Sequence, residues 1–228
     1  PIPIRHSLTI AELLVSLLNQ EDLPLGPDGA LSVVTTQGWE RHRSLIGRPF
    51  VPPSPNMPTL ETALVYPGGC LLEGTNLSEG RGTTRPFQTI GAPFLDAEEF
   101  ARAIGKLPGA WVRPVRFKPT FDKHVGQVCS GVMLHVADEA KFKPVESHLR
   151  IIDTAKNLAP EQFRFLDRVY EFESEHPAFD LLTGTKRARE IIEQGGDVEE
   201  LVQLVSSVDE EWTLRVESAE DLLEEVRA

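Results

Sequence analysis

The chain has 228 residues, 40% of them hydrophobic and 25% charged, which is the ordinary composition of a folded globular protein. Its formal net charge is −12, and eleven acidic residues against two basic ones follow position 196, which argues against nucleic acid as a partner. No apolar run approaches the ~20 residues of a membrane-spanning helix, and the first six residues lack the order of a secretory signal. The first residue is Pro1, so we expect a processed or excised piece from which a targeting segment could have been removed.

The N-terminal residues predict a helix followed by a strand. Thr9 and Glu12 form a capping box, and apolar residues follow at helical spacing: Ile10, Leu13, Leu14, Leu17 and Leu18. We expect this helix to pack against a sheet. Residues 31–37 have the composition of a strand.

A proline-rich stretch comes next and divides the chain. Five of the ten residues from Pro49 to Pro58 are prolines, which lack a backbone donor, so this stretch is predicted to be a linker or a shaped loop. We place a domain boundary in it, between residues 1–52 and residues 53–228. Beyond it we expect a short helix over 59–66, a short buried strand over 70–72 and then an irregular loop.

The rest of the chain alternates before it becomes helical. Asp96 and Glu99 open a predicted helix, and two strands follow over 112–121 and 128–136. Three helices are then predicted over 145–158, over 186–194 and after Asp197. This order predicts an α+β fold, in which the C-terminal helices cover a mixed β-sheet.

The cysteines and histidines predict no metal site and no cofactor. Cys70 and Cys129 match no metal or redox spacing, and we favour two buried thiols over a disulfide. His124 and His135 flank a strand, but no known ligand spacing is present. We interpret His6 as a structural hydrogen-bonding residue, with a contact in a cleft as the alternative. The remaining histidines are expected on the surface: His42, His148 and His176.

Residues 73–87 are the most informative stretch for chemistry. They contain three glycines, two carboxylates, two guanidiniums, an amide and four hydroxyls. They form either a ligand-binding loop or a surface loop whose charges pair with each other; the order of a phosphate-binding loop is absent. Glu73 and Glu79 suit a glycosidase, which uses paired carboxylates. Arg81 or Arg85 could hold a sugar carboxylate, although a structural bridge explains Arg85 equally well.

Several motifs of this chain resemble the NamZ exo-β-N-acetylmuramidases, and together they extend to about Trp212. These motifs are Pro1 to His6, Pro53 to Leu60, Ala63 to Gly68, Glu73 to Phe87, Ile90 to Pro93, Pro119 to Phe121 with Lys123 and His124, Cys129 to Val132 with His135 and Val136, and Phe179 to Gly184. The chain departs from the family pattern at Ser7, at Gly69 and in its acidic end from Glu217.

The resemblance implies a peptidoglycan-recycling glycoside hydrolase that releases N-acetylmuramic acid from non-reducing ends. Its partners would be muramyl saccharides and the missing N-terminal domain of the same protein, a Rossmann-like domain that carries a catalytic Glu. Residues 1–52 would be the tail of that domain, and the active cleft would lie between the two subdomains. An extracellular or periplasmic location also follows from the resemblance, with a cytoplasmic one as the alternative.

The resemblance also supplies a hypothesis for individual residues. Glu79 and Glu73 are the expected catalytic residues, with Glu79 preferred because glycines and an arginine surround it. The expected substrate-binding residues are Asn76, Arg81, Thr83, Thr84, Asn56, Lys123 and His124. Arg81 would hold the lactyl carboxylate, and the amide and hydroxyl groups of the loop would bind sugar hydroxyls. The alternative is a non-catalytic saccharide-binding or partner-docking domain, and a nucleotide- or phosphate-binding enzyme is the weakest reading.

Overall fold

The structure, a computed structural model, describes residues 4, 6–20, 31, 33–38, 40, 49–206, 212–214 and 216–219. The chain divides into two compact units. The larger unit consists of residues 46–206 with residue 1, and the smaller consists of residues 2–45 and 207–228. Of the helices in the described ranges, none has the length and apolar character to cross a membrane.

The smaller unit contains the predicted N-terminal helix, α1 (Ile10–Gln20). The capping box is confirmed, because the Thr9 N–H donates to Glu12 Oε2 at 2.6 Å and the Glu12 N–H donates to Thr9 Oγ1 at 3.3 Å. The described residues of the smaller unit form no sheet for α1 to pack against, and Leu13 of α1 instead packs on a cluster of other apolar side chains: Leu8, Trp212, Val216 and Ala219. The strand expected over 31–37 is wrong for its described residues, which are irregular. The described strands pair with one another and not with these residues.

The larger unit is built on a three-stranded sheet in the order β1-β3-β2. The strands are β1 (Thr89–Ala92), β2 (Ala110–Phe117) and β3 (Cys129–Val136). The α+β class is confirmed, and so are β2 and β3. The sheet is not mixed, however, because both pairings of its described strands are antiparallel. The loop 118–128 between β2 and β3 is shorter than the crossover of a dozen or more residues that a parallel pair needs.

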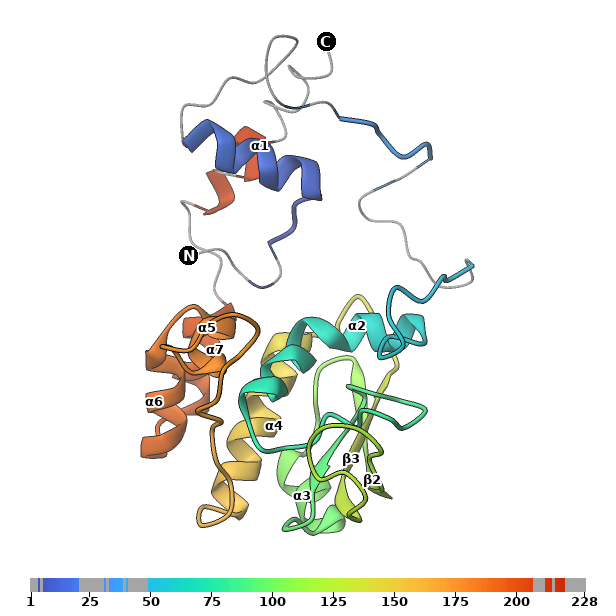
Figure 1. Cartoon of the computed structure of the whole chain (residues 1–228), viewed down its shortest axis with the longest axis vertical. Helices are drawn as coiled ribbons and strands as arrows, with labels where there is room; N and C mark the ends of the chain where they lie inside the picture. The colour runs from blue at the N-terminus through green and yellow to red at the C-terminus, as the bar shows by residue number, and fades with distance from the viewer. Residues whose placement is uncertain are drawn as a thin grey trace. The chain divides into compact units, whose positions relative to one another are not determined.

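Helices cover one face of this sheet. Ile90, Val132 and Leu134 lie on that face and are fully buried. Helix α3 (Ala97–Ile104) contacts β2 and β3, α2 (Leu60–Gly69) contacts β3, and α4 (Pro144–Leu158) packs against α2 and α3 (Figure 1). The opposite face of the sheet carries Trp111, which is 73% exposed.

The predicted start signals of the helices are confirmed where they can be checked. Asp96 caps α3 by accepting from the N–H groups of Glu98 and Glu99. The helix expected over 59–66 is α2, which Thr59 caps and which runs on to Gly69. The strand expected over 70–72 is wrong, because these residues form a 3₁₀ helix, η1 (Cys70–Gly74). The Cys70 N–H donates to carbonyls of α2, so the backbone continues in helical hydrogen bonds and does not pair with a strand.

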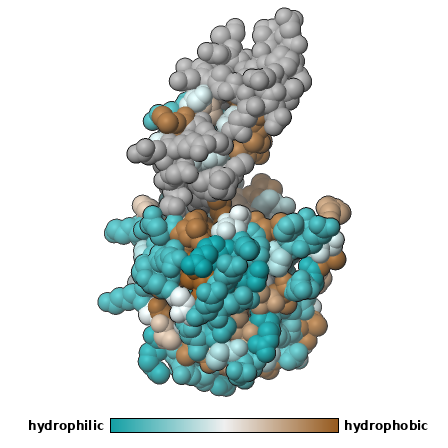
Figure 2. All heavy atoms as spheres, turned by 90° about the vertical axis from the view of Figure 1, so that its left-hand side faces the viewer, coloured by the Kyte–Doolittle hydropathy of each residue, from teal (hydrophilic) through white to brown (hydrophobic). Residues whose placement is uncertain are grey.

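The predicted C-terminal helices are also confirmed, but the main helix contacts with the sheet come from α2 and α3 and not from this group. The group contains α4, α6 (Lys186–Gln194) and α7 (Val198–Ser206), together with the short α5 (Ala178–Thr183), which we did not predict. Helix α4 packs against α7, and α6 packs against α5 and α7. Hydrophilic residues dominate the outer face of this group (Figure 2).

His148 is a correction to the sequence analysis. It was expected on the surface but is fully buried, with Nδ1 2.7 Å from the Pro144 carbonyl oxygen. It lies at helical spacing with Ile151, Ile152 and Ala155 on the buried side of α4, a pattern that outweighs its polar neighbours in the sequence. Burial lowers the pKa of His148 to about 4, so the ring is neutral near pH 7.

The structure agrees better with the other expectations for cysteines and histidines. Cys70 and Cys129 are free thiols, as favoured, but only Cys129 is buried and Cys70 is half-buried. Burial raises the pKa of Cys129 to about 11. The His6 ring accepts from the Leu8 N–H at 3.2 Å, which confirms a structural hydrogen bond. His176 is 64% exposed, as expected for a surface residue. His42 lies outside the described residues.

Candidate functional site

Three segments of the larger unit meet around a group of charged side chains. The first is η1 with the loop that follows it, the second is the β2–β3 loop, and the third is the segment between α4 and α5. They contribute Glu73, Glu79, Arg81, Lys123 and Tyr170, which we call the charge cluster. The surface-loop interpretation of residues 73–87 is right that the charges pair, but wrong about exposure, because Glu79 is 1% exposed.

Glu79 is held by two cations. Arg81 Nε donates to its Oε1 at 2.6 Å, and Lys123 Nζ lies 2.8 Å from its Oε2. Burial alone would raise the pKa of Glu79, but Lys123 and Arg81 together bring it below its ordinary value. Glu79 is therefore a buried carboxylate that stays ionised.

Glu73 is the more accessible carboxylate of the cluster, with 14% of its side chain exposed. Arg81 Nη2 donates to its Oε1 at 2.9 Å, and the Tyr170 hydroxyl donates to its Oε2 at 3.0 Å. Arg81 thus bridges both carboxylates, and its guanidinium also lies 5.2 Å from the centre of the Phe87 ring. Burial and then the negative charge of Glu73 raise the pKa of Tyr170, which keeps this hydroxyl a donor.

Lys123 and His124 fasten the β2–β3 loop to the backbone around η1. Lys123 Nζ donates to the carbonyls of Leu72 at 2.7 Å and Thr75 at 3.1 Å. His124 Nε2 lies 2.7 Å from the Asn76 carbonyl oxygen. Both residues were expected to bind substrate, and the structure places them beside the loop in contacts that position it.

The Asn76 side chain is bound to backbone on both of its polar atoms. Nδ2 donates to the Gln162 carbonyl at 2.8 Å, and Oδ1 accepts from the Arg164 N–H at 2.9 Å. These bonds join the first segment to the third. In this structure the amide therefore positions the loop.

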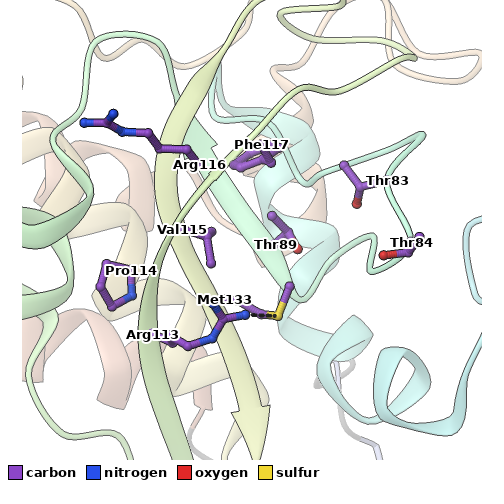
Figure 3. Close-up of a pocket in the computed structure, with 9 residues that line it drawn as sticks. All are labelled: Thr83, Thr84, Thr89, Arg113, Pro114, Val115, Arg116, Phe117 and Met133. Atoms are coloured by element: carbon purple, nitrogen blue, oxygen red, sulfur yellow. Dashed lines mark hydrogen bonds between the residues drawn. The ribbon is translucent and has the colours of Figure 1, made fainter.

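Thr83 and Thr84 lie at the other end of the loop, and both line a pocket of about 420 Å³ next to the sheet (Figure 3). Thr83 Oγ1 donates to the Gly80 carbonyl at 2.6 Å, and Thr84 is exposed. Asn56 lies in the proline-rich segment, where its N–H bonds to Ser54 Oγ at 3.2 Å. None of the contacts described for Asn56 brings it into the charge cluster.

The geometry reverses our order of preference between the two carboxylates. A catalytic carboxylate must reach the substrate, and Glu79 is almost wholly enclosed with a cation on each oxygen. Glu73 has one oxygen on a neutral hydroxyl and is more open. Tyr170 was missed by the sequence analysis, because it lies 97 residues from Glu73 and belongs to no local pattern.

Unusual backbone conformations mark the same three segments. Described residues other than glycine adopt positive φ in these segments at Phe87 (64°), Asp122 (59°), His124 (56°) and Glu171 (54°), and in the smaller unit at Ser7 (60°). Such conformations are sparsely populated for residues with a Cβ and tend to occur at functional sites. Within the described ranges, no group of three or more His, Cys, Asp or Glu side chains is placed to hold a metal ion.

Comparisons with known proteins identify the family. The family described as "exo-beta-N-acetylmuramidase NamZ, C-terminal" matches residues 64–219, and its N-terminal counterpart matches residues 1–61. The peptidoglycan beta-N-acetylmuramidase NamZ of Bacillus subtilis (strain 168) is 44% identical over 206 residues, which is 89% of this chain and 47% of that protein.

Two crystal structures of DUF1343 family proteins from Bacteroides fragilis NCTC 9343 share the fold. One has a TM-score of 0.77 at 28% identity over 93% of this chain and 55% of the other. The second has a TM-score of 0.65 at 25% identity over 93% of this chain and 54% of the other. The chain thus spans about half the length of the relatives it matches. On these matches, the chain belongs to the NamZ family of exo-β-N-acetylmuramidases.

Proposed function

We propose that this chain supplies the C-terminal side of the active cleft in a peptidoglycan-recycling exo-β-N-acetylmuramidase. The enzyme hydrolyses the bond after a terminal N-acetylmuramic acid at non-reducing ends. The observation that carries the proposal is the charge cluster, in which Arg81 bridges Glu73 and Glu79 in a chain whose family is named for this activity. An extracellular or periplasmic location is part of the proposal, because peptidoglycan lies outside the cytoplasmic membrane.

In this proposal Glu73 is the carboxylate that takes part in the reaction. Glycosidases of the common type pair a carboxylic acid, which protonates the leaving oxygen, with a carboxylate that activates water or attacks the sugar. Arg81 and the Tyr170 hydroxyl each bind one oxygen of Glu73, so they fix its orientation. The second carboxyl group would come from an N-terminal domain like the one implied by the longer relatives.

Glu79 has a different part in this proposal. Its lowered pKa makes it a poor proton donor near neutral pH, because it holds no proton to give. It neutralises Lys123 and Arg81, and so keeps Arg81 in place against Glu73. We therefore assign Glu79 as a positioning residue.

A second candidate function is a saccharide-binding or partner-docking domain without catalysis. The observation that favours it is that the described contacts of both carboxylates are already to cations and a tyrosine. Such an arrangement suits recognition as well as it suits chemistry. Turnover by the full-length protein separates the two candidates.

The test is release of 4-nitrophenol from 4-nitrophenyl β-N-acetylmuraminide by this chain and by the full-length product of its gene. We expect turnover in the full-length protein, and a fall in kcat of about a hundredfold or more in Glu73→Gln. The matched control is Glu61→Gln, since Glu61 is 54% exposed and its carboxylate makes a long ion pair, 3.9 Å, with Arg85. This variant should keep wild-type kcat. Unchanged kcat in Glu73→Gln would remove Glu73 from the reaction, and a full-length protein without turnover would favour the binding domain.

A further inference from the structure

The open face of the sheet carries a pocket that the charge cluster does not use. Its lining comes from β1, β2 and β3 and from the loop after Glu79, and it includes Thr83, Thr84, Thr89, Arg113, Val115, Phe117 and Met133. Figure 3 shows Thr89 and Met133 between the β2 side chains and the two loop threonines. The volume of about 420 Å³ lies in the range of small-molecule sites.

The register of the strands explains why there is room on this face. Gly131 of β3 pairs with Gly91 of β1 and with Val115 of β2, and paired residues point to the same face of a sheet. Two adjacent positions therefore carry no side chain. A Cβ on either glycine would overlap the neighbouring strand, so this space is built into the sheet.

A buried hydroxyl in the lining lacks a partner. Thr89 is 2% exposed, and its Oγ1 forms no hydrogen bond with any described residue. A buried hydroxyl without a partner destabilises the folded state, so its presence in a native protein needs an explanation, such as a bound ligand or water. Thr89 is one of the residues that line the pocket (Figure 3).

The pocket is also positively charged. Arg113 is exposed, and it donates from Nε to His135 at 3.1 Å and from Nη2 to the Met133 sulfur at 3.2 Å. A guanidinium has five N–H donors, so most of them remain, and no described carboxylate forms an ion pair with Arg113. The pocket lining contains no acidic residue. Partial burial, followed by the positive charges of Arg113 and Arg85, lowers the pKa of His135, which indicates a positive field here.

We propose that this pocket is a binding subsite for a carboxylate attached to a saccharide, with Arg113 on the carboxylate and Thr89 Oγ1 on a polar group beside it. This assignment rests on the proposed function, and it moves carboxylate recognition from Arg81, whose donors serve Glu73 and Glu79, to Arg113. The apolar parts of Val115 and Phe117 face the same space and suit the carbon skeleton of the ligand. The carboxylate comes either from the lactyl group of muramic acid or from the end of an attached peptide.

The test is calorimetric titration of this chain with three probes. N-acetylmuramic acid has a free lactyl carboxylate, N-acetylmuramoyl-L-alanyl-D-isoglutamine has its carboxylate on the peptide, and N-acetylglucosamine has none. We expect binding of at least one of the acids and none of N-acetylglucosamine, and the acid that binds identifies the source. Absence of binding by both acids at millimolar concentration would overturn the proposal, and so would equal binding of all three probes.

Variants locate the binding in the pocket. Arg113→Gln should weaken binding of the acid about tenfold or more, because a charge-assisted hydrogen bond is lost. The matched control is Arg102→Gln on α3, since Arg102 is exposed and does not line the pocket. Thr89→Val should weaken binding severalfold without lowering the urea midpoint, which distinguishes a ligand-binding hydroxyl from a structural one. Wild-type affinity in Arg113→Gln would overturn the subsite. Absence of turnover by the full-length enzyme, with binding of the acid retained, would overturn only the proposed hydrolysis.

Discussion

Two glutamates six positions apart in one loop have different surroundings, and we propose different roles for them on this ground. Glu79 is 1% exposed and contacts Arg81 and Lys123, whereas Glu73 is partly exposed and contacts Arg81 and Tyr170. A buried charge requires a partner, and Glu79 is the carboxylate nearest to the Lys123 ammonium, which is 7% exposed. The sequence alone could not separate the two residues, because their surroundings come from segments far away in the chain.

The first prediction concerns the substitution Glu79→Gln. It leaves Lys123 and part of Arg81 without a counter-charge in a buried site, so the free energy of unfolding at neutral pH should fall by about 3 to 5 kcal/mol. The lowered pKa of Glu79 means that its contribution is present above its unfolded pKa of about 4.3 and is lost as the pH falls below that value. The difference in urea midpoint between wild type and Glu79→Gln should therefore shrink in acid.

The control for this experiment is Glu61→Gln. Glu61 is 54% exposed and 3.9 Å from Arg85, and exposed pairs of this kind contribute about 0 to 1 kcal/mol. Equal stability of Glu79→Gln and wild type at neutral pH would contradict the view that the charge cluster holds the loop in place.

At the scale of elements, the sequence predicted correctly the helix starts that depend only on neighbouring residues. The caps at Thr9, Asp96 and Asp197 lie within three residues of their partners, so the sequence contains the whole interaction. Apart from the strand expected over 31–37, the elements that were wrong or missed are short ones. An apolar run of three residues, as in η1, fits a strand and a helix equally well, and β1 has only four residues, two of them small.

The joint between α2 and α4 gives the second prediction, which concerns pH. Gly68 of α2 leaves no space for a side chain beside Pro144 and His148 of α4, so the imidazole is enclosed between the helices. Its pKa is lowered from 6.5 to about 4, which corresponds to roughly 3 kcal/mol of stability. A lowered folded pKa means that this stability is fully present above pH 6.5 and is lost as the pH falls towards 4.

The measurement is the urea midpoint of wild type and of His148→Gln between pH 7 and pH 4. The variant should be less stable at pH 7 but should lose less stability across this window than wild type does. His176→Gln is the matched control, because His176 is 64% exposed and should leave the pH dependence unchanged. Parallel curves for wild type and His148→Gln would mean that His148 is not the group responsible.

At the scale of the whole molecule, the α+β class and the order of most elements followed from periodicity and caps, while the site did not follow from the residues alone. Composition marked residues 73–87 as unusual, and the resemblance gave Lys123 and His124 as further candidates. The structure brings these residues together through contacts such as Lys123 Nζ to the Leu72 carbonyl, 51 residues away. Tyr170 and Arg113 became visible only from such long-range contacts, because no motif contains them.

The last prediction concerns the independence of the larger unit. The charge cluster, the pocket, the sheet and helices α2 to α7 all lie within residues 46–206, which form one compact unit. We therefore expect the fragment 46–206 to unfold in a single cooperative urea transition, and Glu79→Gln to destabilise the fragment and the chain by the same amount within about 0.5 kcal/mol.

The matched control is the fragment 89–206, which lacks α2 and Glu79, leaves Lys123 unpaired and should not fold. A fragment 46–206 without a cooperative transition would show that this unit needs the rest of the chain, and a folded fragment 89–206 would show that neither α2 nor the charge cluster is required for its core.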